Sequence, residues 1–443
     1  MGSTQSKPAG SKPWSRVLTH NNNGWNLFKR ARNTGSLMER PGQGVAPRFV
    51  SLPLELGIEI LSWIHPRDVM RFRRLSQNFN HCITSRHFAI LNQQKYIPQS
   101  QTIQFDDSRI HARASEFDLL LPGWPQEYQQ AYINSKYANA VNIQWRYSKF
   151  SCSKFPHLLG GIDSLELLDL SYCLLQGNVP EDFGIPASRN LKNLRLNSNM
   201  LTGRIPSSIG NFENLEKLNF MFNKLNGPLP ASLGSLSQLN ALYLNGNQLS
   251  GTIPVELGLL NNLEILCLNK NKLCGQLPVE LANLEKLRKL DLSSNSLSGQ
   301  IPDPIIRRLS SLLELELSNN EFSGCIPSSL SAPQNLRDVS MSCNNLSGRI
   351  PTELSESPNL EYFYADNNQL SGEIPCSLGN IASLRGLRLS NNKLTGVIPI
   401  EFCRLTLLRE VFVRGNAVDI PGNVCVGSVE YGWFLERTDV LDE

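Results

Sequence analysis

Residues Leu239 to Pro254 read LNALYLNGNQLSGTIP, and residues Leu287 to Pro302 read LRKLDLSSNSLSGQIP. Both follow the template LxxLxLxxNxLxGxIP, which returns about every 24 residues. A period of this length is typical of a solenoid, because one copy cannot bury its own leucines whereas stacked copies bury them in a continuous core. Clear copies start at Leu165, Leu191, Leu215, Leu239, Leu263, Leu287, Leu312, Leu336, Leu360 and Leu384, and a degenerate copy starts at Leu408.

Each position of the template has a physical reason. The alternation in Leu242-Tyr243-Leu244 predicts a short strand with both leucines inward and the tyrosine outward, and stacked copies of it predict a parallel sheet. The buried amide of Asn247 needs hydrogen bonds, which backbone groups of its own and the adjacent coil can supply. Gly251 suits a turn that a Cβ would hinder. The Ile-Pro pair is expected to start a second extended segment, where the missing N–H of proline does no harm.

This pattern resembles the plant-type leucine-rich repeat, and the resemblance covers well over half of the chain. It implies an α/β solenoid, a right-handed superhelix whose parallel sheet lies on the concave side and binds other proteins. The periodicity by itself predicts only the shape, so a structural spacer without a ligand remains the alternative.

A second informative stretch runs from Val50 to Asn92 and opens VSLPLELGIEILSWIHPRDVMRFRRLSQNF. Apolar residues at helical spacing, with Pro66 as a break, predict a small three-helix domain over residues 49–95. The LPxEL opening, the EILSWI run and the PxDV break resemble an F-box, which binds the Skp adaptor of cullin–RING ubiquitin ligases. That resemblance assigns adaptor binding to Leu52, Pro53, Glu55, Leu56, Ile60, Ile64, Pro66, Asp68, Leu75 and Phe79.

Two departures from the F-box pattern leave an alternative open. The second predicted helix is unusually basic, and the tryptophan usual near Phe79 is absent. The alternative is a helical cap that carries LPxEL without binding an adaptor.

Residues 1–48 form a polar, basic tail that is predicted to be disordered. Eight basic residues stand there against the single acidic residue Glu39. The start MGSTQSKP fits the N-myristoylation motif M-G-x-x-x-[ST], with Gly2 as the acceptor and Ser6 four residues after it, and it resembles the start of Src-type kinases. One acyl chain holds a membrane only marginally, so the basic residues that follow would supply the second signal. Chance occurrence of a short motif is the alternative.

The remaining segments are expected to close the two ends of the solenoid. Residues 96–163 are interpreted as a linker and N-terminal cap, with a helix from Pro125 to Tyr137 and a strand from Val141 to Trp145. Their aromatic residues are assigned to core packing, with an aromatic ligand site as the alternative. Residues 164–421 are assigned to the repeats and residues 422–443 to a C-terminal cap. The aromatic residues of the segment 96–163 include Trp124, Tyr128, Tyr132, Tyr137, Trp145 and Tyr147.

No pattern for catalysis or cofactor binding is found. The six histidines are scattered, no metal-ligand spacing occurs, and nucleotide-binding and hydrolase motifs are missing. Glu314 and Glu316 are interpreted as ordinary solvated carboxylates. We therefore expect no enzyme activity, no cofactor and no metal. The net charge of +3 gives no nucleic-acid signature.

The sequence predicts an intracellular protein. None of the ten cysteines forms a CxxC pair, which favours free thiols in a reducing compartment. No apolar run reaches membrane-span length, and the start is too polar for a signal peptide. The predicted location is the cytoplasm, at the inner face of a membrane if Gly2 is acylated.

Two clusters at outward strand positions are predicted to contact a substrate, because exposed aromatic and arginine side chains dominate binding hot spots. The first cluster is Met221, Phe222, Tyr243, Ile265 and Cys267, and the second is Tyr362, Tyr364, Arg385, Arg388 and Phe412. The leading hypothesis is a substrate-recognition subunit of a cullin–RING ligase, with a Skp-type adaptor, a cullin and a protein substrate as partners. The alternative is a membrane-tethered scaffold that assembles no ligase.

Overall fold

The computed structural model describes residues 85, 88–92, 121, 124, 126–149, 155–183 and 189–419. The chain divides into two compact units, Met1–Lys95 and Tyr96–Glu443. Within the first unit residues 88–92 are helical and Phe88 is fully buried, as expected for part of the third predicted helix. The residues of the predicted disordered tail, of the first two predicted helices of the three-helix domain and of the predicted C-terminal cap lie outside the described residues.

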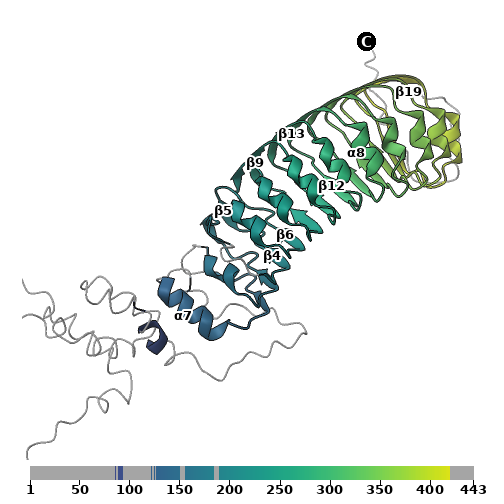
Figure 1. Cartoon of the computed structure of the whole chain (residues 1–443). Coiled ribbons are helices and arrows are strands. Elements are labelled where there is room, and N and C mark those ends of the chain that lie inside the picture. Colours follow the sequence, from purple (N-terminus) through teal and green to yellow (C-terminus); the bar gives the residue numbers. More distant parts are fainter. Residues whose placement is uncertain are drawn as a thin grey trace, which may run out of the picture. The chain divides into compact units, whose positions relative to one another are not determined.

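The described part of the second unit is a stack of coils, each of which adds one strand to a 12-stranded parallel sheet. These strands follow the inner edge of the curved stack, where β4, β6 and β12 are labelled in Figure 1. In sheet order they are β1 (Asn142–Gln144), β2 (Leu167–Asp169), β4 (Asn193–Arg195), β6 (Lys217–Asn219), β8 (Ala241–Tyr243), β10 (Ile265–Cys267), β12 (Lys289–Asp291), β14 (Glu314–Glu316), β16 (Asp338–Ser340), β18 (Tyr362–Tyr364), β20 (Gly386–Arg388) and β22 (Glu410–Phe412).

Strand register follows from the template, because equivalent residues of neighbouring copies stand opposite one another. Leu242 of β8 pairs with Leu266 of β10, and both side chains are fully buried between the layers. Leu244, one position after β8, is buried too, whereas Tyr243 between the two leucines is half-buried and points outward. The parallel sheet and its inward leucines are as predicted.

A second set of short parallel strands runs along the outer edge of the curve, where β5, β9, β13 and β19 are labelled in Figure 1. They lie at or next to the Leu-x-Gly part of the template, and Gly299 has φ +82° in β13, a conformation that disfavours a Cβ. The set comprises β3 (Gln176–Asn178), β5 (Met200–Thr202), β7 (Asn226–Gly227), β9 (Gln248–Gly251), β11 (Lys272–Gly275), β13 (Ser296–Gln300), β15 (Glu321–Cys325), β17 (Asn345–Gly348), β19 (Gln369–Glu373), β21 (Lys393–Val397) and β23 (Ala417–Asp419).

The prediction that Ile-Pro starts a second extended segment is wrong. The extended segment ends before Ile253, and Pro254 instead precedes a short helix, because its fixed φ of −70° suits a helix start. These helices are η4 (His157–Gly161), η5 (Ser207–Asn211), η6 (Ala231–Ser235), η7 (Val255–Leu259), η8 (Val279–Asn283), α8 (Asp303–Arg308), η9 (Ser328–Ser331), η10 (Thr352–Glu356), η11 (Cys376–Asn380) and η12 (Ile400–Arg404).

The asparagine of the template joins consecutive coils, as predicted. The Oδ1 atom of Asn247 accepts the N–H of Leu225 at 3.0 Å. Its Nδ2 atom donates to the carbonyls of Phe220 and Leu244, both at 3.0 Å. One buried side chain therefore satisfies three backbone groups on two coils, and its repetition along the stack holds the register.

The N-terminal end of the stack is closed by α7 (Gln126–Lys136) and β1, close to the predicted helix and strand. Trp124, Tyr132, Tyr137 and Trp145 are buried in a chain of edge-to-face contacts, with ring centroids 5.3, 6.1 and 5.7 Å apart. Core packing is confirmed for these four aromatic residues. It is wrong for Tyr147, which is 58% exposed.

Candidate binding surface

The sheet along the inner edge of the stack presents the candidate binding surface. Each of its three-residue strands buries the middle residue, whereas most of the first and third side chains stay partly exposed. Neighbouring strands are in register, so side chains from successive copies stand beside one another on this face. Repeat proteins use extended surfaces of this kind for recognition.

The first predicted cluster lies over β6, β8 and β10 and is only partly accessible. Tyr243 and Cys267 are register partners on neighbouring strands. Phe222 is 51% exposed, and its ring lies against Gly246 of the next coil, where a Cβ would come within 2.6 Å of Cδ1. Met221 and Ile265 are half-buried.

Cys267 differs from the other members of the first cluster because it is buried. Only 7% of it is exposed, and burial, followed by the charge of Asp291, raises the pKa of its thiol to about 11. Its neighbours Tyr243 and Ile265 therefore provide most of the accessible surface on β8 and β10.

The second predicted cluster is a connected group rather than a set of separate contacts. The Arg388 guanidinium carbon lies 4.5 Å from the ring centre of Tyr364 and 5.3 Å from that of Phe412. Tyr362 lies beside Tyr364, with ring centroids 5.9 Å apart. A cation between two aromatic rings fixes all three side chains, so this end of the sheet presents a preorganised aromatic platform.

The charges of this platform are paired internally. Arg388 donates from Nε and Nη2 to the carboxylate of Glu410 at 3.2 and 3.1 Å. Arg385 lies one position before β20, with Nε 2.7 Å from Oε2 of Glu361. A ligand bound at this end of the sheet would therefore contact mainly aromatic side chains, because the charged side chains are already paired.

Between the two clusters lies an acidic centre, which we define as Asp291, Glu314, Glu316 and Asp338 on β12, β14 and β16. Burial, followed by the charge of Asp291, raises the pKa of Glu316 to about 7. The prediction that Glu314 and Glu316 are ordinary solvated carboxylates is therefore wrong for Glu316. Burial next to like charges opposes ionisation, and only the stacking of three copies brings those charges together.

Sequence reasoning missed the acidic centre, although a signal was present. Aligning the copies on their leucines places carboxylates at the first or third strand position in three consecutive repeats. Exposed Tyr147 and Tyr172 were missed as well. Their rings stack with centroids 4.8 Å apart at the N-terminal end of the stack, and both residues have positive φ.

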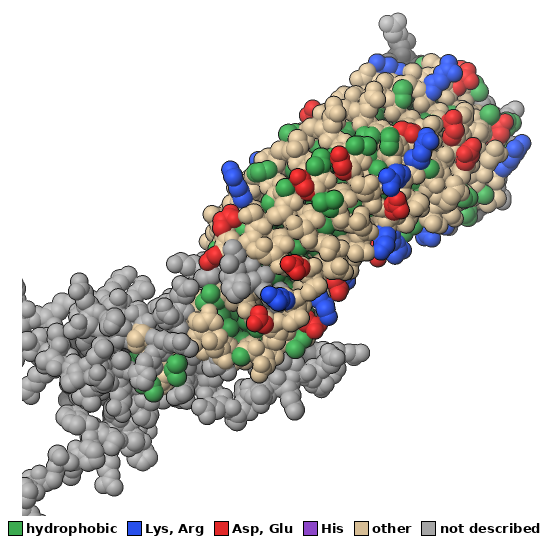
Figure 2. Space-filling view, in the orientation of Figure 1, with side chains coloured by type: hydrophobic (Ala, Val, Ile, Leu, Met, Phe, Trp, Pro, Cys, Tyr) green, Lys and Arg blue, Asp and Glu red, His purple; other side chains and the backbone are tan. Residues whose placement is uncertain are grey.

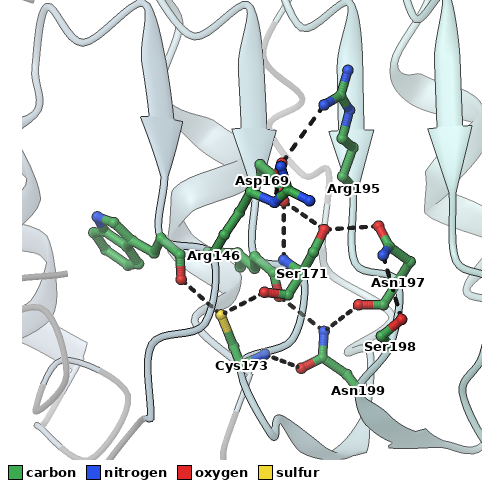
Figure 3. A network of polar contacts seen from close by, with 10 residues as sticks. Arg146, Asp169, Ser171, Cys173, Arg195, Asn197, Ser198 and Asn199 are labelled. Atoms are coloured by element: carbon green, nitrogen blue, oxygen red, sulfur yellow. Dashed lines mark hydrogen bonds and ion pairs between the residues drawn. The ribbon is translucent and has the colours of Figure 1, made fainter. Parts of the chain in front are cut away.

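The first coil is held by a polar network around Asp169, which is only 1% exposed although it occupies an outward strand position (Figure 3). Arg146, two residues after β1, and Arg195 of β4 approach its Oδ2 atom from the two sides, at 3.6 and 3.7 Å. The Ser171 hydroxyl donates to its Oδ1 atom at 2.5 Å. The charge of Asp169 is thus compensated within the protein, which indicates a structural role.

Cys173 occupies the asparagine position in this first coil. Its Sγ donates to the carbonyl of Trp145 at 2.9 Å, and its backbone N–H donates to Oδ1 of Asn199 at 2.9 Å (Figure 3). Burial raises the pKa of the Cys173 thiol to about 12. The thiol therefore stays neutral and tethers the first repeat to the cap.

The face that carries α8 differs from the inner sheet. In Figure 2 acidic and basic side chains are interspersed there, among mostly uncharged polar surface and separate apolar groups. Val255, Leu259 and Val279 of η7 and η8 are exposed apolar residues on these short helices. Isolated apolar groups of this kind are normal on protein surfaces.

The predicted adaptor-binding residues from Leu52 to Phe79, and the lipidation candidate Gly2, lie outside the described residues. Within the described residues, no group of histidine, cysteine or acidic side chains is arranged to hold a metal ion. In that same part of the chain, no helix is both long and apolar enough to cross a membrane.

Comparison with known protein families gives two matches. Residues 148–418 match the model of the leucine-rich repeat region, and residues 49–91 match that of the F-box domain. Both are typically non-catalytic interaction modules. A search of curated proteins gave no match.

Solved structures of repeat proteins are similar to this chain. The Arabidopsis receptor kinase HAESA in complex with the peptide hormone IDA and a co-receptor has 36% identity and a TM-score of 0.58, over 65% of this chain and 52% of that chain. The HAESA ectodomain with an N-terminally extended IDA peptide has 36% identity and a TM-score of 0.54, over 58% and 47%. This chain spans about half the length of those two structures.

Proposed function

The chain belongs to the leucine-rich repeat proteins and carries an F-box, and we propose that it is a substrate-recognition subunit of an SCF-type cullin–RING ubiquitin ligase. The observation that carries this proposal is the combination, on one chain, of a match to the F-box domain and a 12-stranded sheet with aromatic clusters. The F-box binds a Skp-type adaptor, which is held by a cullin. The repeats bind the protein to be ubiquitinated.

The mechanism is proximity rather than catalysis by this chain. Binding of a substrate to the sheet raises the local concentration of its lysines near the charged ubiquitin carrier, which converts a bimolecular encounter into an effectively intramolecular one. A repeat array suits this role, because the nearest-neighbour contacts between its coils keep the binding surface in one shape.

Recognition of a polypeptide is supported by the similar structures. HAESA was solved with a peptide hormone as its ligand. We extend to this chain only the kind of ligand, a polypeptide, and we assign its contacts to the two predicted clusters. The platform of Tyr362, Tyr364 and Arg388 provides the residue types that dominate such interfaces.

The proposed place of action is the cytoplasm. The seven described cysteines are free, as expected in a reducing compartment. Acylation of Gly2 would add attachment to the inner face of a membrane. The alternative function is a membrane-tethered scaffold that assembles no ligase.

Reciprocal variants of the full chain test the proposal. Wild-type protein should co-purify with the adaptor and cullin, and Leu52→Ala/Pro53→Ala should lose both while keeping substrate. Tyr362→Ala/Tyr364→Ala should keep adaptor and cullin while losing substrate. Failure of the wild-type protein to retain the adaptor would contradict the ligase role and favour a scaffold.

A further inference from the structure

We propose that the inner sheet between β8 and β18 binds an extended substrate segment that places a lysine or arginine over Glu316 and Asp338 and an apolar residue on each side of it. This inference rests on the proposed function, because it names the substrate feature that the repeats would select. The occupant is a linear segment with one central cation, not an acidic or uncharged one.

The first support is an excess of negative charge on three consecutive strands. The outward positions of β12, β14 and β16 carry the four carboxylates of the acidic centre and a single ammonium, that of Lys289. Lys289 forms an ion pair with Glu314. Within the described residues, Asp291, Glu316 and Asp338 have no ion-pair partner, so the centre lacks the cation that a bound segment would bring.

The second support is that these carboxylates disfavour one another in the free protein. Glu316 faces Lys289 and Asp291 from β12 and Asp338 and Ser340 from β16, and it shares β14 with Glu314. Burial and then the charge of Asp291 raise its pKa, with Lys289 and the Ser340 hydroxyl offsetting part of the effect. The pKa of Asp338 is raised by burial and by the charges of Glu314 and Glu361, with the charges of Arg337 and Lys289 offsetting part of the effect. A cation bound here would relieve this repulsion, so binding would be coupled to ionisation of Glu316.

The third support is that the flanking surfaces are apolar or internally neutral. On one side Tyr243 and Ile265 are half-buried, with apolar surface exposed on β8 and β10. On the other side Tyr362 and Tyr364 face outward from β18, where Glu410 compensates Arg388. Apolar side chains of the segment would cover these surfaces without leaving a charge unpaired.

Strand spacing sets the distances along the segment. Adjacent strands are about 4.8 Å apart, and an extended chain rises about 3.3 Å per residue. Three strand steps from Tyr243 to Glu316 cover about 14 Å, which is about four residues. Two steps from Glu316 to Tyr364 cover about 10 Å, which is about three residues. The expected pattern is an apolar residue, a basic residue about four positions away, and an aromatic or apolar residue about three positions beyond.

A display experiment tests this pattern without knowledge of the natural substrate. Random 12-residue peptides displayed on phage are selected against the immobilised full chain at pH 8. Enriched peptides should carry one lysine or arginine with apolar residues at the spacing above. A synthetic copy of the best peptide should bind Glu316→Gln/Asp338→Asn about tenfold more weakly than the wild type, and should also bind the wild type several-fold more weakly at pH 6 than at pH 8.

Glu321→Gln, an exposed change on β15 at the other edge of the coils, should leave binding unchanged. Enrichment of acidic or uncharged peptides, no enrichment at all, or equal affinity of the double variant would overturn the inference. Adaptor retention measured on the same samples reports separately on the ligase role.

Discussion

The phenol hydroxyl of Tyr364 donates a hydrogen bond to Oε1 of Glu410 over 2.7 Å, although 46 residues separate them in the chain. The two residues lie on β18 and β22, and Arg388 of β20, between them, donates to the same carboxylate. Three consecutive coils are thereby joined across their outward side chains. This link makes the aromatic platform a rigid feature of the surface.

Tyr364→Phe should remove this link without altering the fold. The hydroxyl helps to satisfy a half-buried carboxylate, so its loss should lower the free energy of unfolding by about 1 kcal/mol. Urea unfolding monitored by circular dichroism measures the change. Tyr362→Phe is the control, because the Tyr362 hydroxyl has no hydrogen bond within the described residues. Equal effects of the two variants would argue against the link.

Asn247→Ala should be far more damaging than an exposed asparagine change. It leaves the N–H of Leu225 and the carbonyls of Phe220 and Leu244 without their side-chain partner, at a cost of about 3 kcal/mol. Hydrogen exchange should show faster exchange in β6 to β10, the strands nearest this position. Asn262→Ala serves as the comparison. It removes two exposed hydrogen bonds, one donated to the Ser237 carbonyl and one accepted from Lys286 Nζ, and should cost less than about 1 kcal/mol.

Glu316 should make stability depend on pH. Its pKa is raised to about 7 from a reference value of 4.5, so between these values the folded state binds more protons than the unfolded state. Stability from this group is fully present below pH 4.5 and is lost as pH rises through 7. The free energy of unfolding of Glu316→Gln, measured relative to that of the wild type, should therefore be higher at pH 8 than at pH 5.

Melting temperatures of both proteins at the two pH values measure this prediction directly. Asp291→Asn gives an independent check, because it removes the largest charge contribution and should lower the Glu316 titration midpoint, which NMR can follow. A Glu316 midpoint near 4.5 in the wild type would contradict the coupling among the acidic residues.

The cysteines should differ sharply in reactivity. Burial raises the thiol pKa of Cys173 to about 12 and that of Cys267 to about 11, which leaves almost no thiolate at neutral pH. Native alkylation with iodoacetamide, analysed by mass spectrometry, should leave both unmodified. Exposed Cys274, Cys325, Cys343 and Cys376 should react first. Rapid labelling of Cys267 would show that the first cluster is more open than the structure indicates.

The sequence by itself determined the solenoid. Leucines at fixed spacing have one way to be buried together, and a buried asparagine in each copy needs backbone partners that only a neighbouring coil can supply. Strand positions, inward residues such as Leu242 and the role of Asn247 were therefore predictable from one copy. The short helix after Pro254 was not predictable, because a proline that follows an extended residue is compatible with both a strand and a helix start.

Only the tertiary structure decided which outward residues act together. Asp291, Glu316 and Asp338 are separated by about one repeat each, and their repulsion exists only because the coils stack in register. The same stacking buries Cys267, pairs Arg388 with Glu410 and leaves Tyr147 exposed. Electrostatic energies and side-chain exposure depend on distances across coils, and a one-dimensional pattern does not contain those distances.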